Sequence, residues 1–139
     1  MAQRITPFLG YEDAAGAIAW LEQAFGFRED AEARSEESGT ITHAELELEG
    51  ARIFLSTPPG YASPRTIRAE SEAARSAADN PWVIDGHLVE VDDVDGHYER
   101  AQAAGANIIR EPDDPGVGMR LYSAEDPEGH RWMFGQRIA

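Results

Sequence analysis

The stretch that decides the fold reads YEDAAGAIAWLEQAFG over residues 11–26, and its plan returns as VDDVDGHYERAQAAG over residues 91–105. Each copy has an Asp that can cap a helix, an amphipathic segment, and a Gly that can end the helix. The apolar positions follow the i, i+4, i+7 spacing of one helix face. They are Ala14, Ile18, Leu21 and Phe25 in the first copy, and Val94, Tyr98 and Ala101 in the second. The repeat predicts two similar modules.

Strand-like sequence follows both helices, and two turns are marked by their composition. Glu49-Gly50 separates two alternating segments, which is a hairpin signal. Asp126-Pro127-Glu128-Gly129 has the residues of a type I turn. We predict a turn at 35–39 and strands over 4–11, 27–34 (the weaker one), 40–49, 51–56, 85–92, 106–111, 118–124 and 130–136.

These segments predict an α+β fold in which two tandem βαβββ modules form curved sheets around a cleft. We place module one at about 4–57 and module two at about 85–137 within a single domain, 1–139. A linker over 58–84 joins them and contains a helix at roughly 68–78. The 139 residues and the 42% hydrophobic content suit one folded domain with its own core.

Composition excludes several classes of function. The chain has no Cys, which excludes disulfides, thiol nucleophiles and thiolate metal sites. A net charge of −14 makes nucleic acid an unsuitable partner for this acidic protein and favours the capture of cations. No signal pattern and no apolar run of about 18 residues is visible, so we expect a cytoplasmic protein with no membrane partner.

Three segments resemble the vicinal oxygen chelate superfamily, which includes glyoxalase I, extradiol dioxygenases, and fosfomycin and bleomycin resistance proteins. They are the helix ending in Ala24-Phe25-Gly26-Phe27, the helix start Val91-Asp92-Asp93-Val94, and Asp126-Pro127-Glu128-Gly129-His130-Arg131-Trp132. The resemblance spans nearly the whole chain. It implies the glyoxalase/bleomycin resistance-type fold and assembly as a homodimer.

The resemblance also implies where a metal would be held, at one position in the first and last strand of each module. Those positions carry Thr6, Phe54, Gly86 and Met133. A divalent ion needs several oxygen or nitrogen donors at once. We therefore predict no metal and no other cofactor.

His87 is a weak alternative candidate for a metal ligand, because Gly86-His87-Leu88 is similar to a strand start of the family. Counting back from Val91 gives Gly86 for the ligand position instead. Since side chains alternate along a strand, His87 would then share a face with Val89 and Val91, under the helices. A β-bulge would return it to the cleft.

Seven residues are predicted to contact a ligand in the cleft. Glu90 is a weak candidate for a catalytic base or a hook for a cation, and it could equally be an exposed carboxylate at a strand end. Arg52 and Arg131 could bind an anionic group, extend to water, or pair with Glu90. Apolar contact is assigned to Phe8, Phe54, Leu88 and Met133, and orientation of the ligand to Arg52, Glu90 and Arg131.

Other polar and aromatic residues receive simpler assignments. His43, Glu45 and Glu47 alternate on one strand face, which favours a solvated face over a new metal or acid–base site. Trp132 and Phe134 are predicted to be core residues, and His97 and His130 to lie at the surface.

The sequence therefore favours a metal-free protein that binds a small molecule and sequesters a drug or toxic metabolite. A cationic, flat aromatic compound is the predicted ligand. Two alternatives stay open. One is a metal-dependent or cofactor-free lyase, isomerase or dioxygenase of the same superfamily. The other is a regulatory binding module without turnover.

Overall fold

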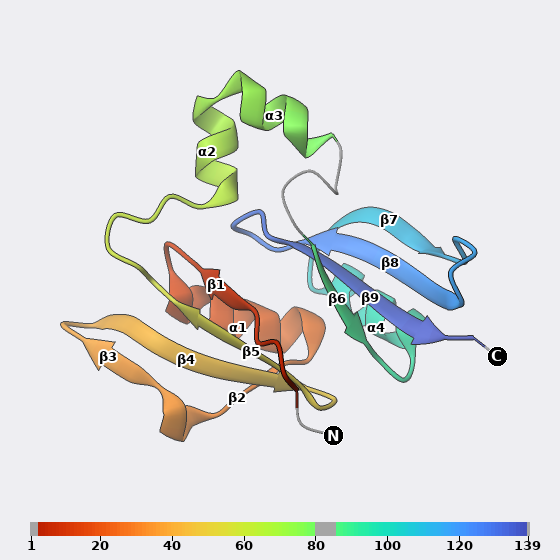
Figure 1. The fold of residues 1–139 in the computed structure, drawn as a ribbon, viewed down its shortest axis with the longest axis horizontal. Coiled ribbons are helices and arrows are strands. Elements are labelled where there is room, and N and C mark those ends of the chain that lie inside the picture. Colours follow the sequence, from red (N-terminus) through yellow and green to blue (C-terminus); the bar gives the residue numbers. More distant parts are fainter. Residues whose placement is uncertain (1–2, 80–85, 139) are drawn as a thin grey trace. The chain divides into compact units, whose positions relative to one another are not determined.

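The computed structural model describes residues 3–79 and 86–138 and divides the chain into two compact units, Met1–Ser63 and Pro64–Ala139 (Figure 1). Each unit contains one curved sheet and one longer helix packed on it. The division falls inside the predicted linker.

The first unit is built around a five-stranded sheet with the order β1-β5-β4-β2, and β3 pairs with β4 outside this path. β1 runs parallel to β5, and the other pairs are antiparallel. The elements are β1 (Phe8–Gly10), α1 (Ala14–Phe25), β2 (Arg28–Glu29), the short 3₁₀ helix η1 (Ala31–Ala33), β3 (Ser35–Glu37), β4 (Thr40–Leu48) and β5 (Ala51–Ser56).

The second unit repeats this plan in a four-stranded sheet with the order β6-β9-β8-β7, in which β6 runs parallel to β9. The equivalent order confirms the prediction of two βαβββ modules in an α+β fold. The elements are α2 (Pro64–Glu70), α3 (Glu72–Ala78), β6 (His87–Glu90), α4 (Val94–Ala103), β7 (Asn107–Asp113), β8 (Met119–Glu125) and β9 (Arg131–Arg137).

The two main helices begin in the same way. The Asp13 carboxylate accepts a hydrogen bond from the Gly16 amide at 3.0 Å, and the Asp93 carboxylate accepts one from the Gly96 amide at 3.1 Å. Each cap satisfies an amide that has no partner within its helix. A Cβ on either glycine would collide with the cap carboxylate, so the Asp-x-x-Gly spacing lets the cap close over the first turn.

Both main helices also end alike. Gly26 has a φ of 81° and Gly105 has a φ of 87°, a conformation that glycine adopts without steric cost. Gly26 directly follows α1, whereas Ala104 separates Gly105 from α4, so the predicted equivalence holds for the backbone conformation and is offset by one residue in position.

The core of each unit lies between the sheet and its helix. In the first unit the predicted stripe of α1 is buried, and Leu9, Leu46 and Leu55 are buried on the sheet. In the second unit Trp132 and Phe134 are fully buried, which confirms their assignment to the core. The stripe of α4, however, runs through Val94, His97 and Ala101, and Tyr98 is only half-buried.

Other differences from the prediction concern short elements. Residues 35–37, predicted as part of a turn, form β3, because Ser38 and Gly39 alone make the turn with φ of 54° and 81°. The weak strand predicted over 27–34 shortens to β2 and η1. The single linker helix is two helices, and Ser71 caps the second of them. Residues 80–85, which include the start of the strand predicted over 85–92, lie outside the described residues.

Among the helices of the described segments, none combines the length and the apolar character that crossing a membrane requires.

Candidate functional site

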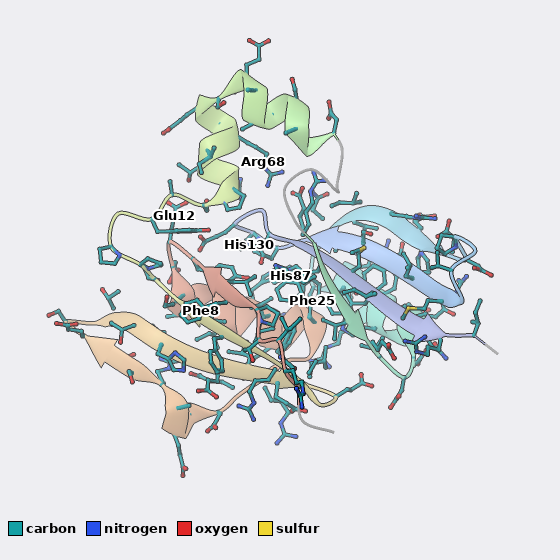
Figure 2. All side chains as sticks on the ribbon, in the orientation of Figure 1. Phe8, Glu12, Phe25, Arg68, His87 and His130 are labelled. Atoms are coloured by element: carbon teal, nitrogen blue, oxygen red, sulfur yellow. The ribbon has the colours of Figure 1, made fainter. Side chains whose placement is uncertain are left out.

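The face of the first sheet opposite α1 carries aromatic and charged side chains, and we call it the first open face. It is formed by Phe8 on β1, Arg52 and Phe54 on β5, and His43 and Glu45 on β4. The register places Phe8 beside Phe54 and Phe54 beside Glu45. Phe8 is 61% exposed, whereas the next residue, Leu9, is 3% exposed. Figure 2 labels Phe8 on β1.

Three rings gather on the first open face. The ring centroids of His43 and Phe54 are 4.8 Å apart with an interplanar angle of 72°. The Phe8 ring lies 6.2 Å from Phe54 and 6.3 Å from His43. Edge-to-face pairs of this kind are favoured between aromatic rings, so the cluster is ordered even though Phe8 is exposed.

A polar chain runs beside these rings. His43 Nε2 lies 2.8 Å from one carboxylate oxygen of Glu45, and Arg52 donates to the other oxygen at 3.0 Å. Asp30 lies 4.0 Å from the same Arg52 nitrogen. The hydrogen bond from His43, followed by the weaker influence of Arg52, lowers the pKa of the Glu45 carboxyl, so this group is ionised at neutral pH.

These hydrogen bonds among His43, Glu45 and Arg52 change the interpretation of the alternating residues in β4. The alternation predicts a solvated strand face for His43, Glu45 and Glu47. It leaves Arg52 to bind an anion, extend to water or pair with Glu90. The structure pairs Arg52 with Glu45 instead. A carboxylate held by an arginine orients the imidazole, which is an arrangement suited to acid–base chemistry.

The second sheet has an equivalent face opposite α4, which we call the second open face. It carries Leu88 on β6 and Met133 on β9, which lie side by side in the register. A Cβ on Gly135 would lie 3.4 Å from Leu88 and closer still to Met119. This face is therefore aliphatic and sulfur-containing where the first one is aromatic.

The charged residues of the second open face are paired. Glu125 accepts from Arg131 at 3.1 Å and from Arg68 of α2 at 2.9 Å (Figure 2). Glu90 accepts from Arg137 at 2.8 Å, and its side chain is 54% exposed. Glu90 thus stands at an exposed strand end, paired with an arginine, and not in apolar surroundings.

His87 occupies the face that the strand register predicted. It pairs with Trp132, and the two rings are 5.2 Å apart on the side of the sheet that α4 covers. His87 therefore lies away from Leu88 and Met133, with its side chain among core rings.

His97 and His130 were predicted to be surface residues, and this prediction is wrong, because they are 8% and 9% exposed. His97 lies on the buried stripe of α4, and its Nδ1 is 2.6 Å from the hydroxyl of Tyr122. Burial raises the pKa of that hydroxyl. The i, i+3 spacing from Val94 was the available signal for the burial of His97.

The turn Asp126–Gly129 forms as predicted, with the Gly129 amide donating to the Asp126 carbonyl at 3.0 Å. The Asp126 carboxylate is buried and accepts from the amides of Glu128 and His130 at 3.1 and 3.0 Å. It also accepts from the indole of Trp132 at 3.1 Å. The backbone of His130 closes this turn, since its carbonyl also accepts from the Asp126 amide at 3.0 Å.

The residues at the four positions where the resemblance predicts a metal do not fit one. Phe54 and Gly86 offer no side-chain donor, Thr6 offers a hydroxyl and Met133 a thioether. Within residues 3–79 and 86–138, no group of three or more His, Asp and Glu side chains is arranged to hold an ion.

Comparison with known proteins identifies relatives over the whole length of the chain. The sequence model of the Glyoxalase/Bleomycin resistance protein/Dioxygenase superfamily matches residues 4–134. An uncharacterized protein of Mycobacterium bovis is 31% identical over 134 residues, which cover 96% of this chain and 83% of that protein.

Solved structures with a similar fold are found as well. TioX from Micromonospora sp. ML1 is 30% identical and superposes with a TM-score of 0.71 over 99% of this chain and 98% of its own. TnmS3 from Streptomyces sp. CB03234, described as an antibiotic binding protein, is 20% identical, with a TM-score of 0.64 over 99% of each chain. The second likeness concerns the fold alone. The matches confirm the predicted glyoxalase/bleomycin resistance-type fold.

Proposed function

The chain belongs to the Glyoxalase/Bleomycin resistance protein/Dioxygenase superfamily, and from this premise we propose that it binds a small, flat aromatic molecule on the first open face, without a metal and without turnover. Sequestration of a drug or toxic metabolite is the role that such binding would serve.

The observation that carries this proposal is the exposed aromatic cluster. Phe8 keeps most of its surface in water, and it stands beside Phe54 and His43 on a sheet face that is otherwise charged. Apolar contact surrounded by a few convergent polar groups is typical of ligand sites. A flat aromatic molecule gains contact with these rings that water cannot supply.

Charge favours a cationic ligand. The net charge of −14 attracts cations to the protein and speeds their capture. In this proposal the guanidinium group of Arg52, held by Glu45 at the edge of the aromatic cluster, orients the ligand. The remaining predicted contacts lie on the second open face and stay predictions: Leu88, Glu90, Arg131 and Met133.

The test is a titration with panels of cationic and anionic flat aromatic compounds, followed by calorimetry at low and high salt. We expect cations to bind, and their affinity to fall with salt. Phe8→Ala and Phe54→Ala should each weaken binding about tenfold or more, since each removes one ring contact. Val117→Ala, which trims an exposed apolar side chain of the second unit, is the matched control and should bind normally.

Two results would contradict this assignment. Binding that ignores Phe8 and Phe54 but is lost in Leu88→Ala would move the ligand to the second open face. Tight binding of anions that is lost in Arg131→Ala and unaffected by Glu90→Gln would overturn the preference for cations.

The absence of a metal is tested separately. Elemental analysis of protein purified without chelator should find no stoichiometric zinc, nickel, iron or manganese, because Thr6, Phe54, Gly86 and Met133 cannot hold one. About one ion per chain that disappears with His87→Ala would restore the metal-dependent alternative. Homodimerisation and a cytoplasmic location complete the proposal, and sedimentation and cell fractionation test them.

A further inference from the structure

The geometry around His43 suggests a specific chemical group on the ligand. Its Nε2 is engaged by Glu45 at 2.8 Å. Within the described part of the chain, Nδ1 of the same ring accepts no hydrogen bond. In the neutral ring with the proton on Nε2, Nδ1 carries a lone pair and is an acceptor.

Glu45 keeps the ring in that state. One oxygen of its carboxylate accepts from the ring and the other accepts from Arg52. Glu45 therefore fixes both the orientation and the tautomer of the His43 ring. A carboxylate in this position also stabilises the imidazolium that forms if Nδ1 gains a proton. The charged groups nearest to this pair are Arg52 on β5 and Asp30 before η1. From β3, the neutral Ser35 lies opposite His43.

The neighbours of the imidazole are aromatic. Phe54 meets the His43 ring at 4.8 Å and Phe8 lies at 6.3 Å. A ligand ring in contact with these phenyl groups would bring its substituents to the edge of the imidazole. The group that suits an acceptor beside an aromatic surface is a weakly acidic hydroxyl attached to an aromatic ring.

We propose that His43, oriented by Glu45 and Arg52, is the proton acceptor of a binding site for phenolic ligands. This inference rests on the proposed function, whose ligand is a flat aromatic molecule, and adds the hydroxyl as the recognised group. It is independent of the preference for cations, because the hydroxyl is recognised whatever charge the rest of the ligand carries. In the binding step the phenolic O–H bond breaks, and the proton forms a new N–H bond at His43 Nδ1. The bonding electrons stay on the phenolate oxygen, and Glu45 offsets the new charge on the ring.

The test compares 4-nitrophenol with its methyl ether, 4-nitroanisole, which keeps the ring and lacks the proton. Affinities are measured by calorimetry on the full chain at moderate salt. We expect the phenol to bind about tenfold more tightly than the ether, which is the upper end of what one hydrogen bond to a neutral acceptor contributes. At a pH low enough to keep free 4-nitrophenol neutral, the absorbance of the bound compound should shift toward that of the phenolate.

Three variants assign the effect to residues. His43→Phe keeps a ring and should bring the ratio of the two affinities to about one while the ether still binds. Glu45→Gln should lower the ratio. Glu47→Gln, two residues further along the same strand face, should leave it unchanged. Circular dichroism confirms that each variant is folded.

The outcomes separate the two proposals. If the ether binds and the ratio is near one in the natural chain, the phenol inference fails and the binding function stands. The same holds if the preference for the phenol survives His43→Phe. If neither compound nor any aromatic panel member binds, both are overturned.

Discussion

The two units of this chain share their architecture and differ on one face. Their sheets have equivalent strand orders, their main helices begin with the same Asp-x-x-Gly cap, and both end at a glycine of positive φ. Their open faces are unlike. The first has phenyl rings and a His–Glu–Arg chain, and the second has Leu88 and Met133 beside paired charges. We infer from this difference that the helix-covered face of each sheet maintains the fold, and that the open face can differ between the units without changing it.

The hairpins before the last strand of each unit differ as well. The β4–β5 turn is made by Glu49 and Gly50 alone, with φ of 48° and 91°. The β8–β9 connection is longer and is organised around the buried carboxylate of Asp126. Both turns use a glycine of positive φ, at Gly50 and at Gly129, but only the second is organised around a buried carboxylate.

The largest predicted effect tests the role of that carboxylate. Asp126→Ala leaves two backbone amides and the Trp132 indole without their acceptor in a buried place. We expect a loss of about 3 kcal/mol or more in the free energy of unfolding, because each buried donor without a partner is costly. Urea denaturation followed by tryptophan fluorescence measures it.

The matched change in the first unit is Glu47→Ala. Glu47 also accepts from a turn amide, that of Gly50 at 2.7 Å, but at an exposed position. Its loss should cost no more than about 0.5 kcal/mol. Equal effects of the two changes would contradict the contrast drawn between the hairpins.

The next effect concerns the core of the second unit at high pH. Burial raises the pKa of Tyr122, so its stabilising neutral form is fully present below the unfolded value of about 10. Stability is lost as the pH rises above that value, by up to about 1.4 kcal/mol for each pH unit. Tyr122→Phe should remove this part of the alkaline loss and cost about 1 kcal/mol at neutral pH, through the missing bond to His97. Unfolding curves recorded between neutral and alkaline pH measure this. If the free energy of unfolding falls equally steeply with pH in both proteins, the prediction is wrong.

The helix caps test the likeness of the two units. Asp13→Ala and Asp93→Ala should each destabilise by about 1 kcal/mol, because each removes one cap of similar geometry. Asp→Asn at the same positions should cost less, since the amide oxygen still accepts. Thermal unfolding of the four variants measures this, and a cost confined to one of the two helices would break the equivalence.

The smallest effect concerns the first open face in acid. His43, and to a lesser degree Arg52, lower the pKa of Glu45, so its stabilising contribution is present above the ordinary value and is lost as the pH falls through the lowered one. His43→Phe should raise the titration midpoint of Glu45 more than Arg52→Gln does. Carboxyl NMR titration of the two variants measures the midpoints, and an unchanged midpoint in His43→Phe would contradict the hydrogen bond.

Much of the fold could be predicted from the sequence, because side-chain period and helix caps are local properties. The period of two placed Arg52 with Phe54 and His87 with the core. In the structure Arg52 and Phe54 both lie against Glu45, and His87 lies against Trp132. β3 could not be predicted in this way. Its three residues are polar and exposed, so no apolar alternation marked them.

The candidate site was predictable only in part. The alternation in β4 indicated which side chains share a face, but His43 and Glu45 are separated by two steps along a strand, about 7 Å. Their contact depends on side-chain rotamers and on Arg52 of the adjacent strand, which are set by tertiary packing. His97 was different, since its position on the stripe of α4 was visible and its polarity led to the wrong assignment.

The contact between Arg68 and the β8–β9 turn has an evolutionary consequence. Arg68 of α2 donates to the carbonyl of Gly129 and to Glu125, and a Cβ at position 129 would occupy the space of the guanidinium group. The φ of Gly129, 91°, restricts that position further. Substitutions at positions 68 and 129 should therefore be correlated in evolution. A side chain at 129 should be tolerated better in a chain that has already lost the arginine. A double-mutant cycle of Arg68→Ala and Gly129→Ala measures this epistasis as the departure of the combined effect from additivity.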